Sequence, residues 1–330
     1  MKAAYQARYG PPELVEIRDV DKPVPGDGQV LVRVKAASVN RADLDGLKPK
    51  PGFIRLFMGL RAPRNHDVGV DAAGVVEAVG PGVTRFTVGD AVMIDTFASG
   101  GLGGGAFAEY VVGREKAFQT IPEGMSFEEA ATLPHSAVLA LQALRTRDGR
   151  TIRPGDQVLI DGASGNVGPF AVQIAKAMGA EVTGVASTAK LDFVRSLGAD
   201  HVIDYTQVDL TRAAERYDWI VAVDAHHSIL RVGRALKPGG VYATLGGDTG
   251  TIFSALLGSL LLSRFGDKWR GLMLWWKPMH GPDVDRLKEL IAAGKLRPVI
   301  DRRYPLDQVA EALRYVEDGH PRGKVIINVS

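Results

Sequence analysis

Cysteine is absent from this sequence of 330 residues. Its absence excludes disulfides, thiolate catalysis and every zinc site that needs a sulfur ligand. An excess of charge of either sign is missing as well, because 40 Lys and Arg residues stand against 38 Asp and Glu residues, a formal net charge of +2. Nothing in this balance favours nucleic acid or an anionic membrane as a partner.

Long apolar runs are missing too. The most apolar stretch, residues 254–262, is far shorter than the roughly 20 residues that a membrane-spanning helix needs. The first ten residues, MKAAYQARYG, contain no apolar segment followed by a small-residue cleavage site. These features predict a cytoplasmic protein without stable membrane insertion.

Two domains are expected, because a chain of 330 residues is at the upper limit for a single hydrophobic core. The first 120 residues are typical of a β-rich domain. Short strands are predicted over 29–37, 72–80 and 91–96, separated by turns rich in Gly, Pro and Asp. A basic and apolar segment, 53–65, interrupts them and is predicted to be a loop.

After about residue 125 the pattern changes to alternating strands and helices. Ser126 and Glu129 have the spacing of a capping box, which predicts a helix that continues through 130–144. Strands then alternate with helices of about 10–15 residues, which indicates parallel βαβ units with right-handed crossovers. Two amphipathic helices and a closing strand are predicted over 283–294, 307–319 and 325–329.

Three glycines, Gly162, Gly165 and Gly168, lie between a predicted buried strand, 158–160, and a predicted helix, 166–178. Glycines here let the backbone turn tightly and let a ligand approach without meeting a Cβ atom. The N-terminus of the helix presents free N–H groups to an anion. Because this pattern follows a strand and opens a helix within a βαβ unit, it predicts dinucleotide binding.

The segment GVASTAK, residues 184–190, follows the next predicted strand and indicates which dinucleotide is bound. An acidic residue at this point accepts the ribose 2′-OH of NAD and repels the 2′-phosphate of NADP. The segment contains no carboxylate, whereas Ser187, Thr188 and Lys190 suit a phosphate. The sequence therefore predicts NADPH as the cofactor.

Several motifs spread over nearly the whole chain point to one family. They are SVNRADLDG (38–46), GVDAAGVVEAVG (69–80), GGAFAEYVV (104–112), ATLPHSAVLALQAL (131–144), GASGNVG (162–168), VRSLGADHVIDY (194–205), LKPGGVYATLGG (236–247), RRYPLDQVAEAL (302–313) and RGKVIINV (322–329). Together they resemble the medium-chain dehydrogenase/reductase superfamily, in its zinc-independent, quinone oxidoreductase-like branch.

The resemblance implies an α/β fold with a Rossmann domain, a doubly wound parallel sheet, over residues 125–277. A GroES-like β-rich catalytic domain is then made from residues 1–124 and 278–330. It also implies a homodimer and a substrate cleft between the domains, over the nicotinamide. The apolar segments 251–262 and 272–276 have two interpretations, a subunit interface or core, and the wall of an acceptor pocket.

A metal site is not expected at the positions where zinc-containing alcohol dehydrogenases carry their ligands. Those relatives have Cys where this chain has Asn40, and a His-Glu pair where it has Val70 and Asp71. Valine has no donor atom and an asparagine amide is a poor zinc ligand. Asp43 and Asp71 are instead expected to organise the backbone.

The resemblance also assigns site residues. The pyrophosphate contacts are Ser164, Gly165, Asn166 and Val167; the 2′-phosphate and adenosine-ribose contacts are Ser187, Lys190 and Tyr205; the nicotinamide contacts are Leu245, Gly246, Trp275 and Trp276; and further cofactor contacts are Asn40, Thr132 and Lys324. Substrate contacts are Asn40 and His135. Asn40 either donates to a developing oxyanion or holds the nicotinamide ribose. The segment DAHHS, 224–228, departs from a common family pattern.

The expected function is NADPH-dependent, metal-independent hydride transfer to a quinone. The alternative is reduction of the C=C bond of α,β-unsaturated ketones or aldehydes, because both acceptors delocalise the incoming charge onto an oxygen. A third hypothesis, from a different class, is a non-catalytic NADPH-binding protein of crystallin-like or regulatory type. No catalytic residue apart from Asn40 is predicted.

Overall fold

The computed structural model describes residues 1–49, 55–99, 104–146, 148–209, 216–225, 227, 229–247 and 278–329. The chain divides into two compact units, one made of residues 1–138, 277–288 and 298–330, the other of 139–276 and 289–297. These divisions fall inside two helices, α4 (Val138–Ala143) and α9 (Gly281–Ala292). The domain boundaries at 124/125 and 277/278 remain a prediction.

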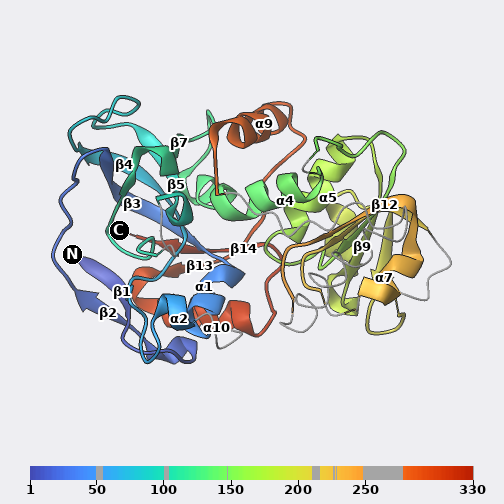
Figure 1. The fold of residues 1–330 in the computed structure, drawn as a ribbon, viewed down its shortest axis with the longest axis horizontal. Coiled ribbons are helices and arrows are strands. Elements are labelled where there is room, and N and C mark those ends of the chain that lie inside the picture. The colour runs from blue at the N-terminus through green and yellow to red at the C-terminus, as the bar shows by residue number, and fades with distance from the viewer. Residues whose placement is uncertain are drawn as a thin grey trace. The chain divides into compact units, whose positions relative to one another are not determined.

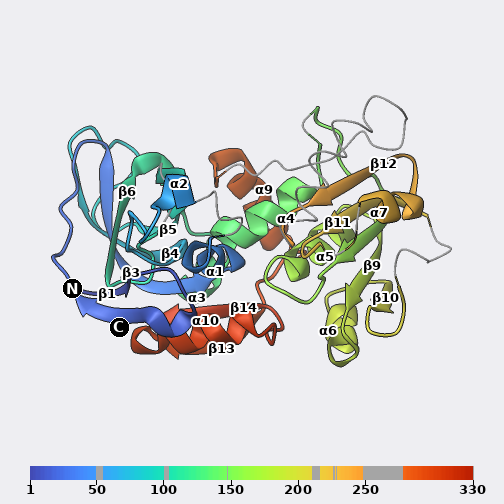
Figure 2. The ribbon, with the colours of Figure 1, turned by 60° about the horizontal axis from the view of Figure 1, so that its bottom comes forward.

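The second unit is built on a parallel sheet of five strands in the order β10-β9-β8-β11-β12. Its strands are β8 (Gln157–Asp161), β9 (Glu181–Ala186), β10 (His201–Asp204), β11 (Tyr217–Ala222) and β12 (Leu236–Thr244). Figures 1 and 2 show its helices against this sheet: α5 (Gly168–Ala177), α6 (Leu191–Ser196) and α7 (Ile229–Ala235). The alternation predicted from the sequence is confirmed.

The order of these strands defines where a ligand site is expected. The chain enters the sheet at its centre with β8, adds β9 and β10 on one side, and then returns to add β11 and β12 on the other. The carboxyl ends of β8 and β11 are therefore the topological switch point, the place where open parallel sheets bind their ligands.

The first unit is β-rich. A seven-stranded sheet has the order β13-β14-β3-β4-β5-β7, with β6 paired to β3, and β1 pairs with β2 in a separate sheet. The strands are β1 (Lys2–Gln6), β2 (Val15–Asp19), β3 (Gln29–Val39), β4 (Asp71–Val79), β5 (Ala91–Asp95), β6 (Tyr110–Arg114), β7 (Phe118–Thr120), β13 (Ile300–Pro305) and β14 (Lys324–Asn328). Its helices are α1 (Arg41–Leu47), α2 (Arg55–Met58), α3 (Phe127–Ala130) and α10 (Val309–Glu317).

The amphipathic helix α10 covers the core of this unit. Its buried residues are spaced three or four apart, the period that puts them on one face of a helix: Val309, Ala312, Leu313 and Val316. That face packs on an apolar core formed mainly by Val, Ala and Ile side chains of β3, β4, β5 and β14. The closing strand β14 pairs antiparallel with β3, so the two ends of the chain share one sheet.

Two local predictions are wrong. The helix expected through 130–144 is broken into α3, a π-helical turn at Leu133–Ala137 (η5) and α4. Pro134 lies in that turn, and it lacks the N–H that an uninterrupted α-helix would use. The segment 53–65, expected to be a loop, contains the short helix α2.

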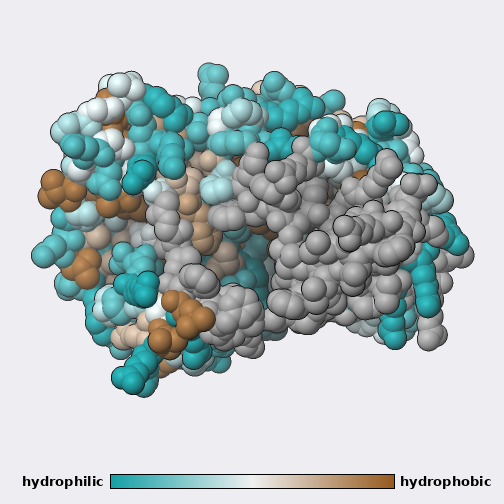
Figure 3. All heavy atoms as spheres, viewed as in Figure 1, coloured by the Kyte–Doolittle hydropathy of each residue, from teal (hydrophilic) through white to brown (hydrophobic). Residues whose placement is uncertain are grey.

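Exposed large apolar side chains are few and separate among the described residues. They include Leu56, Leu60 and Val88 in the first unit and Tyr205 and Val208 in the second. On the face drawn in Figure 3, small apolar groups likewise alternate with hydrophilic ones, as on an ordinary protein surface. In the part of the chain that the structure describes, no helix combines the length and apolar character needed to cross a membrane.

Replacing Ser126 by alanine tests the capping box that opens α3. Ser126 Oγ accepts from the Glu129 N–H at 3.3 Å, and Ser126 N donates to Glu129 Oε2 at 3.0 Å, as predicted from the sequence. Ser126→Ala should lower the free energy of unfolding by about 1 kcal/mol. Urea denaturation measures this, with Ser126→Thr as the matched control because it keeps the accepting hydroxyl.

Candidate functional site

The glycine turn lies at the switch point of the parallel sheet. Gly162 follows β8 directly with a φ of +82°, and a Cβ there would lie 3.2 Å from Val223 Cβ, just after β11. Gly168, the first residue of α5, has even less room, because its Cβ would lie 2.2 Å from Gly162 O and 2.5 Å from the carbonyl carbon of Ala163. The helix thus begins against the backbone of the turn, and position 168 has space for glycine alone.

Gly165 differs from the other two glycines because the space beside it is open. Among the described residues, a Cβ at Gly165 would meet Gly162 O alone within 4 Å, at 3.8 Å. Asn166 Oδ1, next in the chain, is buried without a hydrogen-bond partner in the described structure. An open backbone and an unsatisfied amide oxygen at a helix N-terminus fit a ligand that has both anionic phosphates and hydroxyl groups, such as a dinucleotide.

Leu245 and Gly246 lie at the same edge of the sheet, where β12 ends. Leu245 N donates to Ala222 O at 2.9 Å, and Ala225 N donates to Gly246 O at 3.0 Å. The structure therefore brings these predicted residues to the carboxyl ends of β11 and β12, on the edge that carries the glycine turn. Trp275 and Trp276, predicted for the same segment, lie outside the described residues.

The residues predicted to read the ribose follow β9 and β10. Ser187 and Lys190 are half-buried, and Lys190 N donates to Ser187 O at 2.8 Å. Tyr205 is exposed, and its N–H donates to Ala186 O at 3.2 Å. The three residues are thus at the carboxyl ends of two neighbouring strands.

Sequence reasoning missed Asp204, the last residue of β10. In the parallel pairing of β10 with β9, Asp204 stands opposite Ala186. Its Oδ2 accepts a hydrogen bond from the Thr188 hydroxyl. A carboxylate therefore does lie beside the GVASTAK segment, although it comes from the adjacent strand. The sequence feature that could have indicated this residue is VIDY, residues 202–205, in which Asp204 is the last residue of a predicted strand.

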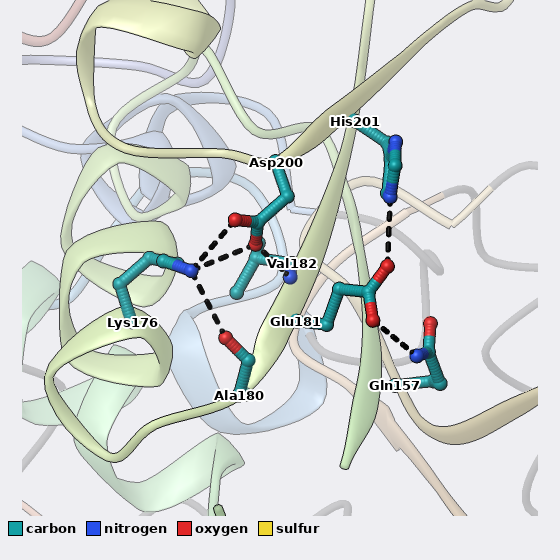
Figure 4. A network of polar contacts seen from close by, with 7 residues as sticks. All are labelled: Gln157, Lys176, Ala180, Glu181, Val182, Asp200 and His201. Atoms are coloured by element: carbon teal, nitrogen blue, oxygen red, sulfur yellow. Dashed lines mark hydrogen bonds and ion pairs between the residues drawn. The ribbon is translucent and has the colours of Figure 1, made fainter. Parts of the chain in front are cut away.

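At the amino ends of the strands, charged and polar side chains are paired with one another (Figure 4). Glu181, the first residue of β9, accepts from Gln157 Nε2 at 2.6 Å and contacts His201 Nε2 at 2.8 Å. Lys176 contacts both carboxylate oxygens of Asp200 at 2.8 Å. The contacts of Glu181 join the amino ends of β8, β9 and β10 to one another, and the Lys176–Asp200 pair joins α5 to the residue before β10. Both lie away from the glycine turn, and we assign them a structural role.

In the first unit, the side chain of Asn40 is fully hydrogen-bonded. Its Oδ1 accepts from Lys324 Nζ at 2.6 Å and from Ser136 Oγ at 3.0 Å. Its Nδ2 donates to Asp71 Oδ2 at 3.0 Å and to Ser38 O at 3.2 Å. An asparagine amide has two N–H donors, so both are already engaged. Donation to an oxyanion would require one of these bonds to break.

Lys324 is a buried cation, 1% exposed, at the start of β14. Its ammonium also donates to Ser136 Oγ at 3.0 Å and Val39 O at 3.3 Å. Burial lowers the pKa of Lys324 to about 8, although the nearby carboxylates of Asp71 and Asp43 oppose this effect. Lys324 is predicted to contact the cofactor, but its ammonium group already donates to three protein oxygens.

Three buried carboxyl groups belong to the same cluster: Asp43 and Asp71 interact with the Lys324 ammonium, and Asp95 is the register partner of Asp71. Burial raises the pKa of Asp43 to about 7, that of Asp95 to about 6, and that of Asp71 well above its ordinary value. Asp71 faces Asp95 across the β4–β5 pair, so their like charges also disfavour ionisation of Asp71. One ammonium does not neutralise three carboxylates, and protons are therefore retained in the cluster near neutral pH.

Asp43 and Asp71 organise the backbone as expected from the sequence. Asp43 Oδ2 accepts from Asn40 N at 2.7 Å, and Asp71 Oδ2 accepts from His135 N at 3.1 Å. Burial, together with the charge of Lys324, lowers the pKa of His135 to about 3. His135 is therefore neutral near pH 7. Thr132 is completely buried, and its hydroxyl donates to Glu129 O at 2.6 Å.

The donor set around Asn40 does not fit zinc. Val70 is buried and has no ligating atom, and Asn40 Oδ1 is held by an ammonium group, whose charge would repel a metal ion. Within the described ranges, no group of three or more His, Cys, Asp or Glu side chains is arranged to hold a metal ion.

Replacing two glycines of the turn by alanine should have different effects on the free energy of unfolding. Gly168→Ala should lower the free energy of unfolding by about 1–3 kcal/mol, because the new methyl group would overlap backbone atoms that have little freedom to move. Gly165→Ala should leave stability unchanged, since its methyl group would enter open space. Urea denaturation of both variants distinguishes these effects, and equal losses would contradict the geometry.

The buried cluster should make stability depend on pH through Asp43. Its pKa is raised from 3.8 to about 7 in the folded protein, so its contribution is complete at low pH and is lost as pH rises through this window. Asp43→Asn removes the titrating group, and its stability relative to the parent should rise between about pH 4 and pH 7. The gain should be a few kcal/mol at most, since one unit of pKa is worth about 1.4 kcal/mol.

Urea denaturation at several pH values measures this difference. Asp192→Asn is the control, because Asp192 lies on α6 in the second unit with its side chain 98% exposed and is not among the groups that shift the pKa of Asp43. That variant should keep a constant offset from the parent. Parallel pH profiles for Asp43→Asn and the parent would contradict the prediction.

Comparison with known proteins places this geometry in a family. Residues 26–123 match the alcohol dehydrogenase GroES-like domain, and residues 197–327 match the zinc-binding dehydrogenase family. The chain is 33% identical to human NAD(P)H oxidoreductase RTN4IP1, mitochondrial, over 91% of this chain and 82% of that protein. It is 32% identical to quinone-oxidoreductase QR1, chloroplastic, of Triphysaria versicolor, over 94% and 92%.

A third relative is NADPH-dependent alkenal/one oxidoreductase, chloroplastic, of Arabidopsis thaliana, 30% identical over 99% of this chain and 79% of that protein. Among solved structures, the quinone oxidoreductase from Coxiella burnetii superposes with a TM-score of 0.86 at 29% identity, covering 100% and 99% of the two chains. An NAD-dependent alcohol dehydrogenase superposes with a TM-score of 0.82 at 29% identity, covering both chains completely. The chain belongs to the medium-chain dehydrogenase/reductase superfamily, in its quinone oxidoreductase-like branch, with a GroES-like unit and a Rossmann-like parallel sheet.

Proposed function

We propose that this protein is an NADPH-dependent, metal-independent oxidoreductase that transfers a hydride to a quinone. The observation that carries the proposal is the glycine turn, whose open Gly165 face lies at the switch point of the parallel sheet. The names of the relatives support NAD(P)H-dependent oxidoreductase activity in general. The phosphate on the cofactor and the identity of the acceptor are our proposal.

We assign the cofactor to the carboxyl edge of the sheet. Ser164, Gly165, Asn166 and Val167 would hold the pyrophosphate and its riboses, Leu245 and Gly246 would lie along the nicotinamide half, and Ser187, Lys190 and Tyr205 would face the 2′-phosphate. The preference for NADPH rests on the hydroxyl and ammonium groups of Ser187 and Lys190. When bound, the nicotinamide supplies a hydride, and one proton completes reduction of a quinone to a hydroquinone.

The buried cluster of the first unit would act as a framework for the substrate side of the site. Asn40 has both amide hydrogens engaged, so we assign it the role of orienting its surroundings. Lys324 and Ser136 fix the orientation of that amide. His135 is neutral near pH 7, so it would offer a neutral imidazole to the acceptor. Thr132 still has lone pairs to accept a hydrogen bond.

An electron-poor, conjugated acceptor is the chemistry that this framework suits best. A quinone spreads the charge of an arriving hydride onto an oxygen and needs only a hydrogen-bond donor to stabilise it. A simple aldehyde needs stronger polarisation, which the side chains around Asn40 do not offer. The relative named quinone-oxidoreductase QR1 supports the quinone, and the relative named alkenal/one oxidoreductase supports the alternative, reduction of an α,β-unsaturated carbonyl.

Assembly and location stay predictions. We propose a homodimer and a cytoplasmic protein, and we note that several relatives carry the words mitochondrial or chloroplastic in their names. The apolar segments 251–262 and 272–276, proposed as interface, core or pocket wall, lie outside the described residues.

Turnover with three acceptors tests the proposed function. NADPH oxidation is followed with an ortho-quinone, an enone and a simple aldehyde, each with and without a chelator. We expect turnover of the quinone, unchanged by chelator, and little turnover of the aldehyde. Gly165→Ala should lower kcat/KM for NADPH by about tenfold or more, because its methyl group would occupy the open face beside the turn.

The other outcomes separate the alternatives. Turnover of the enone alone would replace the quinone by an α,β-unsaturated carbonyl. Tight NADPH binding without turnover of any acceptor would favour a binding protein of crystallin-like or regulatory type. Loss of activity on chelation would contradict metal independence, and activity of Gly165→Ala equal to that of the parent would contradict the proposed cofactor site.

A further inference from the structure

Asp204 occupies a position that bears on cofactor choice. In dinucleotide-binding domains an acidic side chain after the second strand accepts the ribose 2′-OH of NAD. The strand in that place here, β9, ends without one. Asp204 supplies a carboxylate at the same level from the neighbouring strand, because its Cα is the register partner of Ala186.

Threonine donors occupy most of the acceptor directions of the Asp204 carboxylate. Oδ1 accepts from Thr206 N at 2.9 Å and from Thr206 Oγ1 at 2.7 Å. Oδ2 accepts from the Thr188 hydroxyl. A carboxylate has about four lone-pair directions for acceptance, and these three donors occupy both directions of Oδ1 and one of Oδ2, so at most one remains for a ribose hydroxyl.

The hydrogen bonds also keep Asp204 charged. The Thr188 hydroxyl, followed by the Thr206 hydroxyl, holds the pKa of Asp204 below its ordinary value. Lys190 and Ser187 follow β9 in the same short turn as Thr188. The turn therefore combines a phosphate-compatible lysine with an acid whose acceptor oxygens are occupied by threonines.

We propose that Thr188 and Asp204 form a latch that sets the nucleotide preference of this protein. With the latch closed, the Thr188 hydroxyl competes with the ribose 2′-OH for Asp204 Oδ2, and Ser187 and Lys190 would bind a 2′-phosphate. With the Thr188 hydroxyl removed, Asp204 Oδ2 becomes an acceptor for the 2′-OH. This inference rests on the proposed function, because it assumes a nucleotide at the carboxyl edge of the sheet.

Two substitutions should shift the preference in opposite directions. Thr188→Val keeps the shape of the side chain but removes the donor, and it should shift the preference toward the unphosphorylated nucleotide by about fivefold. Asp204→Asn removes a negative charge and should shift it toward the 2′-phosphate by about fivefold, the size of one charge contact across water. In Thr188→Val combined with Asp204→Asn, the shift caused by valine should vanish because no carboxylate remains to be released.

Calorimetric titration of the full chain with adenosine 5′-monophosphate and adenosine 2′,5′-bisphosphate measures the preference as a ratio of dissociation constants. Glu181→Gln is the control, since it removes the same charge at the opposite edge of the sheet and should leave the ratio unchanged. An unchanged ratio in Thr188→Val and Asp204→Asn would overturn the latch. If the parent protein binds neither fragment, the cofactor site of the proposed function is itself overturned.

Discussion

The close approach of α5 to the turn before it is the constraint on which the second unit depends. A methyl group at Gly168 would lie 2.2 Å from Gly162 O, so the helix axis is set by the absence of a side chain. That approach aims the first turn of the helix at the switch point between β8 and β11. The open face at Gly165, the buried amide of Asn166 and the ends of β11 and β12 are arranged around it. The absence of a Cβ atom at Gly168 thus allows the close packing that places these groups together at the carboxyl ends of the strands.

The first unit is organised by charge placed inside it. An ammonium, three carboxyl groups and an asparagine amide are buried together, at a cost that the hydrogen bonds of Lys324 and Asn40 offset in part. Asn40 spans the centre of this arrangement, with a cation bonded to its oxygen and an acid bonded to its nitrogen. Such a network favours a single arrangement of β3, β4, η5 and β14.

The features that could be predicted from the sequence are those set by residues close together in the chain. The glycine turn, the capping box at Ser126 and the alternation of strands and helices are local, and each was readable from residues close together in the chain. The saturation of Asn40 was not, because its partners Asp71, Ser136 and Lys324 lie 31, 96 and 284 residues away. Asp204 was missed because strand register, which no local pattern encodes, brings it opposite Ala186. Pro134 was visible, yet its π-helical turn depends on tertiary packing.

The position of Lys324 in the chain has a consequence for biosynthesis. Asn40 and Asp71 leave the ribosome early, whereas the residue that supplies their cation follows 284 residues after Asn40. All five strands of the second unit are synthesised in between, before β14 can pair with β3. Completion of the first unit therefore requires contacts between segments 284 residues apart, which is a long-range step of folding.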